Sequence, residues 1–421
     1  MPFSRRSRLA TSPSPWSRPV RRAVLFALAL GLAGLAGVAT FAASPLIESP
    51  LLPSFANVLG QGGSFTANAS GYSSLFYNPA AFANEGGSFT LYSSSAWIYA
   101  DPARFLDALG TSGASAWLSL MDEQLADGGF GFGLCDGVGY VANGLGIGAV
   151  VNVDLYLYGD PASTAVGDLV ITVAYISGAA LPIQLGPVKV KLGADIRPMF
   201  RIRAPADYAV MTDLVTAQFA GGNPLATLNT TSALYGWALG FDLGAIVEWG
   251  PLKAGVVVRD FPRTNFHYTT STFGDILASL RDTGDLPSGG TAADGYYIPM
   301  DVSLGIAYAP DIASLRGNFQ PVLHASLNEL VAVIRDGRSF LTLLHVGAEI
   351  RLFRFMELRA GLNQGHLSFG GGLQLFFVDL QASVFTRELG RSYGDRSSSG
   401  LSLEAAIRMP ATRQARAPKR Q

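Results

Sequence analysis

Hydrophobic and polar residues alternate with a period of two along most of the chain beyond residue 88. In residues 188–203 the even positions are almost all apolar, and the charged side chains stand at odd positions: Lys189, Lys191, Asp195, Arg197, Arg201 and Arg203. Because successive side chains of a β-strand point to opposite faces, this segment is predicted to be a strand with one apolar and one polar face. The same alternation returns in residues 300–306, 345–352, 378–384 and 401–409.

The pattern predicts about fourteen strands joined by connections of alternating length. The strands are expected to start near Ser88, Gly129, Leu145, Asp168, Val188, Ser232, Leu252, Ile298, Phe319, Leu341, Met356, His366, Val378 and Gly400. Long connections are expected at 100–127, 204–231 and 261–297, and tight turns at 143–144, 250–251 and 353–355. Long outer loops with short periplasmic turns are typical of bacterial outer-membrane barrels, in which an even strand number leaves both ends on the periplasmic side.

Composition separates the two folds that this alternation allows. A soluble β-sandwich turns its apolar faces inward, whereas a membrane barrel turns them toward lipid and its charges toward the lumen. Only 14% of the residues are charged, against about 25% in soluble domains. Residues 169–188 are uncharged and long enough for a membrane helix, but they contain two glycines and two prolines. We therefore predict an all-β fold, a transmembrane antiparallel β-barrel of about 14 strands, because a closed barrel satisfies its own backbone in lipid.

The first 43 residues look like an export signal. Six arginines between positions 5 and 22 precede an uncharged apolar run, 23–43, which ends in Ala42 and Ala43. A basic region, an apolar region and a small-residue exit are typical of a secretory signal peptide, and a retained membrane helix is the alternative. The chain is thus divided into a signal peptide (1–43), an N-terminal hatch or plug (44–87), a barrel (88–409) and a basic tail (410–421), and its expected location is the bacterial outer membrane.

Two predicted hairpins place opposite charges across from each other. The tight turns at 250–251 and 353–355 give four expected pairs on the polar face: Glu248 with Lys253, Asp242 with Arg259, Arg351 with Glu357, and Glu349 with Arg359. Opposite charges across a ladder favour that register, so these pairs are expected to line the lumen, although chance matches are the alternative. Four aromatic residues are expected on the outward face of the sixth strand, where such side chains commonly lie at the lipid headgroups: Tyr235, Trp237, Phe241 and Trp249.

Several function classes find no support in the sequence. The net charge is −1, so no global field would steer a nucleic acid to the chain. A single cysteine, Cys135, excludes a disulfide framework, and the four histidines do not have metal-ligand spacing. No G-x-S-x-G elbow or P-loop is present. We expect no catalytic residues, no metal, no cofactor and no nucleic-acid partner, and therefore no enzyme.

The segment before the first strand carries a family resemblance. Residues 60–76 are rich in Gly, Ala and Ser, and they lead to Tyr77, then Asn78, Pro79 and Ala80, then Phe82. This stretch resembles the long-chain fatty-acid transporter (FadL-like) superfamily of outer-membrane barrels, and most closely its PorV-like branch. Residues 345–349, 358–362 and 388–390 are similar to the closing hairpins of that branch. The basic tail after Met409 departs from the usual aromatic end that the outer-membrane assembly machinery reads.

The resemblance implies a plugged barrel that passes hydrophobic molecules, typically fatty acids, without an energy source. The hatch side chains that it makes candidates for ligand contact are Phe65, Leu75, Phe76, Tyr77, Asn78, Pro79, Ala80 and Phe82. The alternative is that they only pack the hatch against the wall. Arg197 and Arg201 are candidates for holding a carboxylate headgroup, or else they pair with lumen acids. The PorV-like branch implies a second function, a non-transporting barrel that anchors or escorts exported proteins. Expected partners are a hydrophobic small molecule, membrane lipid and the assembly machinery.

Overall fold

The computed structural model describes residues 46–411, except 112, 222–225, 288–289, 311, 313–318 and 354. The predicted signal peptide and all but the first two residues of the predicted basic tail lie outside the described residues.

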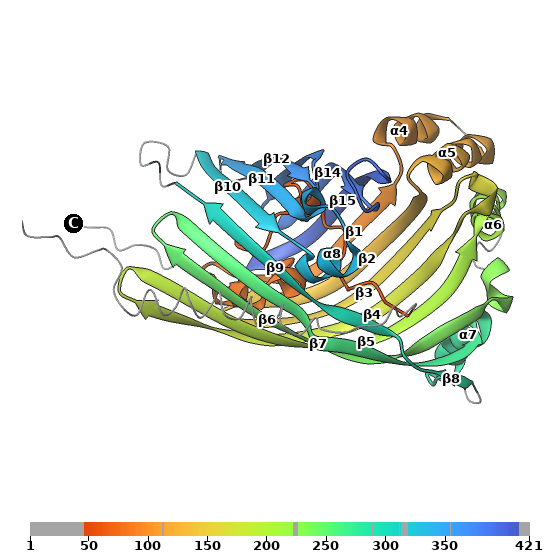
Figure 1. Ribbon diagram of the computed structural model, residues 1–421, viewed down its shortest axis with the longest axis horizontal. Helices are drawn as coiled ribbons and strands as arrows, with labels where there is room; N and C mark the ends of the chain where they lie inside the picture. The colour runs from red at the N-terminus through yellow and green to blue at the C-terminus, as the bar shows by residue number, and fades with distance from the viewer. Residues whose placement is uncertain are drawn as a thin grey trace, which may run out of the picture.

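Within this part of the chain, fourteen strands form a closed antiparallel barrel (Figure 1). In order around the ring they are β1 (Ser88–Tyr99), β2 (Phe130–Ala142), β3 (Leu145–Tyr158), β4 (Val166–Leu185), β5 (Val188–Asp207), β6 (Ser232–Trp249), β7 (Leu252–Thr272), β9 (Tyr297–Tyr308), β10 (Phe319–Leu327), β11 (Leu344–Leu352), β12 (Met356–Asn363), β13 (His366–Leu375), β14 (Val378–Glu388) and β15 (Ser397–Pro410). Strand β1 pairs with β15 and closes the ring. The three-residue β8 (Thr291–Ala293) only extends the edge of β7. The predicted barrel and its strand number are confirmed.

The barrel has the polarity expected of a membrane protein. Ile306, Leu323 and Leu403 are exposed on the outer face, whereas Lys191 and Glu404 are buried in the interior. This inversion of a soluble protein's pattern matches a barrel that meets hydrocarbon on its outside. Val190 also points outward, but Val188, Leu192 and Val247 on the same face cover it.

The predicted turns fix the register as expected. Ala142 pairs with Leu145, Trp249 with Leu252, and Leu352 with Met356. Three of the four expected charge pairs stand opposite each other across these hairpins: Glu248 with Lys253, Arg351 with Glu357, and Glu349 with Arg359.

The fourth expected charge pair is not formed. Asp242 makes an ion pair with Arg197 of β5, and Arg259 pairs with Asp301 of β9. The cause is a large bulge, because β7 takes eight residue steps from Val258 to Phe266 where β6 takes five from Ala238 to Leu243. A bulge redirects side chains locally, which alternation in the sequence cannot show.

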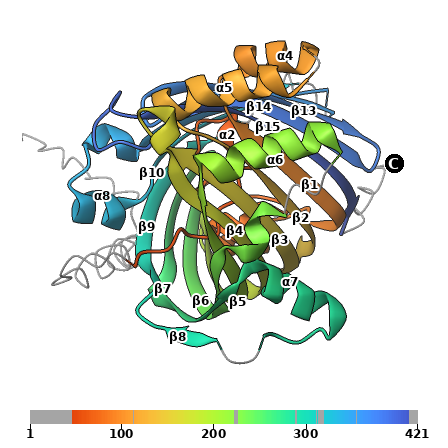
Figure 2. The same ribbon diagram turned by 90° about the vertical axis from the view of Figure 1, so that its right-hand side faces the viewer.

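Helices occupy several connections at one end of the barrel (Figure 2). They are α4 (Pro102–Gly110), α5 (Ala114–Asp127), α6 (Tyr208–Ala220), α7 (Phe273–Asp282) and α8 (Leu330–Asp336), with short 3₁₀ turns η2 (Ala162–Thr164), η3 (Thr227–Thr230) and η5 (Phe340–Leu343). Leu120, Met121 and Leu125 of α5 share one apolar cluster with outward residues of β3 to β5. Tyr235 is buried in this cluster and donates to the Pro287 carbonyl at 2.8 Å, so it does not face lipid as predicted. None of the described helices is long and apolar enough to cross a membrane.

The barrel wall is uneven in height. Strands β4 to β7 have 18–21 residues, whereas β10 to β14 have 8–11. A membrane strand needs about 9–11 residues, so the short strands only just cross the hydrocarbon. The long strands extend past them at the end that carries α5 to α7 (Figure 1).

Candidate functional site

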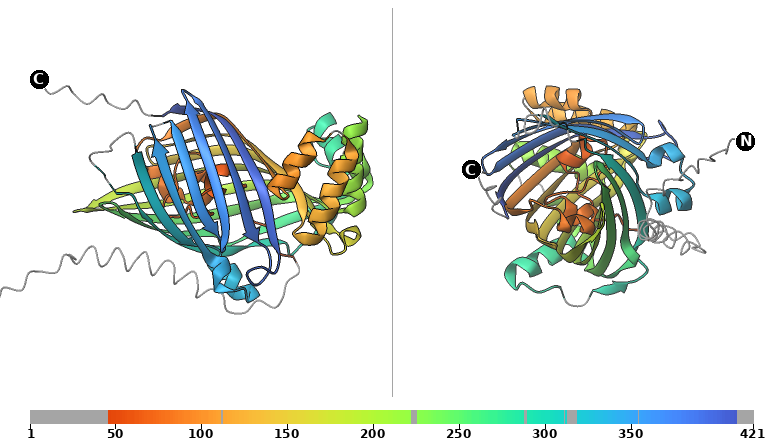
Figure 3. Two further views of the ribbon diagram at one scale, coloured as in Figure 1. Left: turned by 90° about the horizontal axis from the view of Figure 1, so that it is seen from above. Right: turned by 90° about the vertical axis from the view of Figure 1, so that its left-hand side faces the viewer.

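The hatch lies inside the barrel (Figure 3). It contains α2 (Ala56–Leu59), α3 (Ser74–Tyr77) and η1 (Pro79–Ala83). Asn78 joins the last two turns, because its Oδ1 accepts from the Ala80 N–H at 3.1 Å and its Nδ2 donates to the Thr66 carbonyl at 2.8 Å. Proline suits the first position of such a turn, where no N–H is needed. The Asn-Pro-Ala triplet is therefore a folding element of the hatch.

Glycines of the wall make room for the hatch. A Cβ added at Gly244 would lie 2.1 Å from Asn78 Oδ1, and one at Gly193 would lie 2.4 Å from the Pro79 backbone. Other wall glycines approach the hatch in the same way: Gly139 and Gly148 at Leu75, Gly146 and Gly178 at Phe82, Gly255 and Gly305 at Ala67, and Gly347 and Gly361 at Gln61. The close approach of hatch backbone and side chains to the wall explains why so many inward strand positions are glycine.

Alanine at Gly244 is expected to loosen the hatch. The new methyl group would overlap Asn78, whose side chain is fully buried and holds both Thr66 and Ala80. Overpacking of this kind costs about 1–3 kcal/mol. Limited proteolysis of the folded barrel should release hatch fragments faster from Gly244→Ala than from the parent chain. Gly110→Ala is the control, because a methyl group there meets no atom within 4 Å. Equal cleavage rates would show that the hatch does not depend on this contact.

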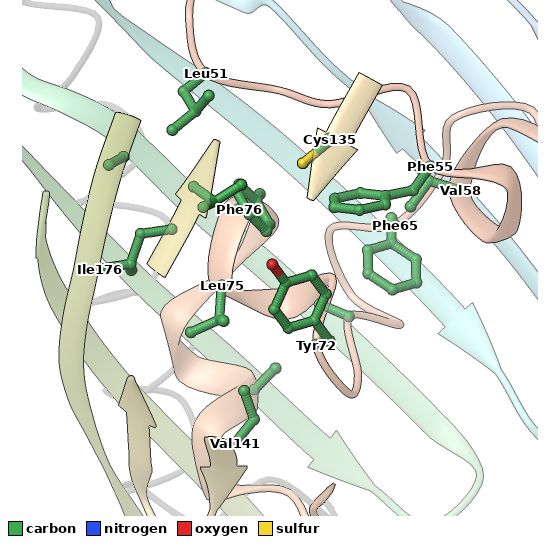
Figure 4. Close-up of a cluster of buried hydrophobic side chains, with 14 of the residues drawn as sticks. Leu51, Phe55, Val58, Phe65, Tyr72, Leu75, Phe76, Cys135, Val141 and Ile176 are labelled. Atoms are coloured by element: carbon green, nitrogen blue, oxygen red, sulfur yellow. The ribbon is translucent and has the colours of Figure 1, made fainter. Parts of the chain in front are cut away.

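The predicted hatch contacts are mostly packed away from open space. Phe65, Leu75, Phe76 and Phe82 are 0–2% exposed and belong to one cluster with Phe55 and Tyr72 (Figure 4). Phe55 packs on Phe76 at 5.2 Å between ring centroids, and Phe65 on Tyr77 at 5.3 Å. Asn78, Pro79 and Ala80 are buried against β5 and β6. Of these candidates, Tyr77 borders the cavity of about 680 Å³ described below.

Arg197 is enclosed by acids. Its guanidinium contacts Asp242, Asp260 at 3.4 Å and Asp195 at 3.7 Å, and all four side chains are almost fully buried. The Asp260 N–H donates to Asp242 at 2.8 Å and Thr264 donates to Asp260 at 2.8 Å, so the cluster also organises the β7 bulge. This guanidinium is therefore engaged within the protein.

Arg201 is paired with the hatch. Its NH1 donates to Glu48 at 2.9 Å, and Arg203 donates to the other oxygen of the same carboxylate at 2.9 Å. Arg201 also donates to the Thr172 hydroxyl at 2.9 Å and lies 4.7 Å from the Phe266 ring centroid. A carboxylate of the chain itself thus occupies the place proposed for a ligand headgroup.

The remaining predicted lumen charges form a network on β11 and β12. Arg359 donates to Glu349 at 2.8 Å, to Gln381 at 3.0 Å and to Glu357, while Arg351 pairs with Glu357 at 2.8 Å. The structure brings these four residues together on one polar face, where they satisfy one another.

A cavity of about 680 Å³ lies between the hatch and the short side of the wall. Hatch residues Leu52, Val58, Leu59 and Tyr77 supply its apolar floor. Its upper part is lined by polar and charged residues: Arg259, Asn328, Glu329, Arg335, Asp336, Arg338, His345, Asn363, Gln364, Arg387, Glu388 and Arg391. Of these lining residues, Tyr77 alone is among the ligand contacts predicted from the sequence.

Arg387 is held between aromatic rings. Its guanidinium lies 3.9 Å from the Tyr99 ring centroid and 5.2 Å from that of Tyr156, and it forms no ion pair with any described residue. Cation–π contacts of this kind stabilise a desolvated charge without neutralising it. The alternation of β14 carries a signal for this residue, because extending it by four positions places Phe385 and Arg387 on the inward face.

The neighbouring Glu388 has no free acceptor capacity for a ligand. Its carboxylate accepts from the N–H groups of Gly390, Gly394 and Arg396 at 2.7–2.8 Å, and it also contacts His366. These bonds fold the loop after β14 over the rim of the cavity.

On the opposite side of the cavity the charges come from α8 and its flanks. Arg338 donates to Glu329 at 2.9 Å, and Arg335 donates to Asp336 at 2.7 Å. The hydrogen bond from Arg335 lowers the pKa of the Asp336 carboxyl. No pattern of strand or helix in the sequence marked these residues, because α8 is short and follows a strand that ends early. Among the described residues, no group of three His, Cys, Asp or Glu is arranged to hold a metal ion.

Comparisons with known proteins give a likeness to solved channels and transporters. No family profile matches the sequence, and no curated protein matches it. Among solved structures, the chain is similar to the CymD monoaromatic hydrocarbon channel (13% identity, 87% of this chain, 100% of that chain, TM-score 0.49). It is also similar to the Pseudomonas putida toluene transporter TodX, with 13% identity over 87% of this chain and 99% of that chain and a TM-score of 0.44. A Pseudomonas aeruginosa FadL homologue is similar with 13% identity over 84% of this chain and 98% of that chain and a TM-score of 0.41.

Proposed function

We propose that this chain is an outer-membrane barrel for the passive uptake of hydrophobic small molecules such as fatty acids. The observation that supports it is the cavity of about 680 Å³ with an apolar floor, lying on a plug inside a membrane barrel. Pockets of about 300–1,000 Å³ suit small organic ligands. Burial of an alkyl chain contributes about 0.8 kcal/mol per methylene, so binding needs no energy source.

Passage would require the hatch to shift, because Phe65 and Phe82 are buried in the packed apolar cluster of the hatch. Export by residues 1–43 and insertion by the outer-membrane assembly machinery belong to the same proposal. It assigns the chain no chemical reaction and no cofactor.

Filling the cavity is expected to reduce uptake. Tryptophan at Leu59 would occupy the apolar floor, so we expect Leu59→Trp to lower both the rate of labelled oleate uptake and the amount of ligand that co-purifies with the barrel. The assay is done in an outer membrane that lacks other fatty-acid carriers. Leu106→Trp on α4 is the control, because that side chain is 61% exposed and does not line the cavity. An uptake rate for the parent chain no greater than that of cells without the barrel contradicts the proposal.

A second candidate is a non-transporting barrel that anchors or escorts exported proteins. Two observations favour it: the hatch cluster is closed, and the outer helices expose Leu106, Leu109 and Phe219. In that case the parent chain would show no uptake, and a co-purifying protein would be lost on changing Leu106 and Leu109 to serine.

A further inference from the structure

The short strands set the level of the cavity relative to the membrane. Because β10 to β14 have only 8–11 residues, all of their length is needed to cross the hydrocarbon. The upper ends of these strands, at Leu327, Asn363 and Glu388, therefore lie at the outer surface of the bilayer. Asn328, Gln364 and Leu389, which directly follow these ends, line the cavity. The cavity is thus level with the outer-leaflet headgroups.

The wall beside the cavity is incomplete as a sheet. Strands β9 and β10 pair only from Leu304–Tyr308 to Leu323–Leu327, although β9 begins at Tyr297. Above this point α8 takes the place of strand β10. Its Val331 packs with Val258 and Val302, and its N–H donates to Asp301 at 3.1 Å. At the upper end of β9, Tyr297 also pairs with the hatch segment around Ile47. The cavity is therefore bounded on this side by a short helix and a hatch segment and not by a continuous wall strand.

The helix and the turn after it present apolar side chains outward. Ile334 and Phe340 are 59% and 63% exposed, and Leu341 is also exposed. Figure 2 shows α8 on the outside of the ring, beside β9 and β10. Apolar side chains at the height of the headgroups, next to arginines, are typical of segments that lie in the membrane interface.

The cavity itself carries an excess of positive charge. Five arginines and three acids line it, and three of these arginines are paired: Arg259 with Asp301 outside the lining, Arg335 with Asp336 and Arg338 with Glu329. Glu388 is saturated by backbone N–H groups, and neither Arg387 nor Arg391 forms an ion pair with a described residue. The Nε atoms of Arg338 and Arg387 and one terminal nitrogen of Arg335 are buried without a hydrogen-bond partner. An anionic group would accept hydrogen bonds from these nitrogens.

We propose that the cavity takes the anionic headgroup of an amphiphile from the outer leaflet, which slides in laterally over α8. Arg338, Arg387 and Arg391 bind the headgroup, and the alkyl chain lies on Leu52, Leu59 and Tyr77. The proposal rests on the function proposed above and adds to it a charge preference and a route from the membrane side.

The first experiment measures the charge preference. The full barrel is placed in nanodiscs of phosphatidylcholine with a minor share of phosphatidylglycerol, and retained lipid is counted by native mass spectrometry. Phosphatidylglycerol should be enriched on the parent chain. Arg338→Gln with Arg387→Gln should weaken its retention about tenfold or more, as expected for losing charge-assisted hydrogen bonds. Arg391→Gln, at an exposed side chain, should weaken it less, and Arg281→Gln on α7 should not change it.

Three outcomes overturn the proposal. One is equal retention of the neutral and anionic lipids by the parent chain. Another is unchanged enrichment in both the double variant and Arg391→Gln, provided that their gel mobility shows folded barrels. The last is binding of lauric acid added from water with no enrichment of phosphatidylglycerol, which would assign the arginines to a free fatty acid. In each case the uptake of labelled oleate by the parent chain would still test the proposed function separately.

The second experiment measures the position of the turn η5, which follows α8. A nitroxide at Phe340→Cys should be more accessible to oxygen than to a water-soluble nickel complex, because it lies in the interface. The chain's own Cys135 is buried and does not label. Phe219→Cys on α6, an exposed residue on the tall side of the barrel, should show the reverse order. Nickel accessibility at Phe340 equal to that at Phe219 overturns the lateral route.

Discussion

Replacing Arg197 by leucine is expected to destabilise the barrel more than any other single change considered. Asp195, Asp242 and Asp260 surround this guanidinium, and none of the four side chains is exposed by more than 2%. Removing one partner of a buried ion pair costs about 3–5 kcal/mol, because it leaves a buried charge without compensation. Here Arg197→Leu would leave three buried carboxylates without a positive partner.

The measurement is the temperature at which the barrel, in detergent, loses its compact mobility on a gel. We expect a clear drop for Arg197→Leu. Arg281→Leu is the matched control, since Arg281 pairs with Asp282 on exposed α7, where ion pairs contribute about 0–1 kcal/mol. Asp195→Asn removes one excess carboxylate and should be tolerated better than the arginine change. If Arg197→Leu and Arg281→Leu lose their compact mobility at the same temperature, the cluster around Arg197 does not stabilise the fold.

The strands of the barrel and their pairing could be predicted because they depend on residues that are close together in the sequence. Period-two alternation assigns each side chain to a face, and the tight turns at 143–144, 250–251 and 353–355 then fix which residues stand opposite each other. The pairs Arg351–Glu357 and Glu349–Arg359 follow from these two facts alone. The same rule failed at Asp242 and Arg259, because the β7 bulge shifts the register between them.

The partners of the lumen arginines could not be predicted, because they are not local. Alternation places Arg201 inside the barrel, but its partner Glu48 is 153 residues away and belongs to the hatch. The cavity arginines on the α8 side were missed for a related reason. Arg335 and Arg338 lie where β10 stops short and α8 replaces it, and no periodic pattern marks that change.

We expect the Glu48 carboxylate to hold the first described residues of the hatch, 46–52, in their folded position. This carboxylate is bound by Arg201 and Arg203 at 2.9 Å each, and it is almost fully buried. Glu48→Gln leaves the buried Arg201 without an anion, at a cost of about 3–5 kcal/mol. Because each 1.4 kcal/mol corresponds to about tenfold in an opening equilibrium, amide exchange in residues 46–52 should become about a hundredfold faster or more.

A second hatch acid supplies the control. Glu85 pairs with Lys189 at 3.0 Å, but its side chain is 91% exposed, so Glu85→Gln should change exchange in residues 46–52 very little. Two backbone hydrogen bonds also join this segment to Tyr297. The Glu48 N–H donates to the Tyr297 carbonyl at 2.9 Å, and the Tyr297 N–H donates to the Leu46 carbonyl at 3.1 Å. Slow exchange that persists in Glu48→Gln would mean that these backbone bonds hold the segment. If Glu48→Gln does speed exchange, adding Arg201→Gln should restore protection, because the unpaired arginine is then removed.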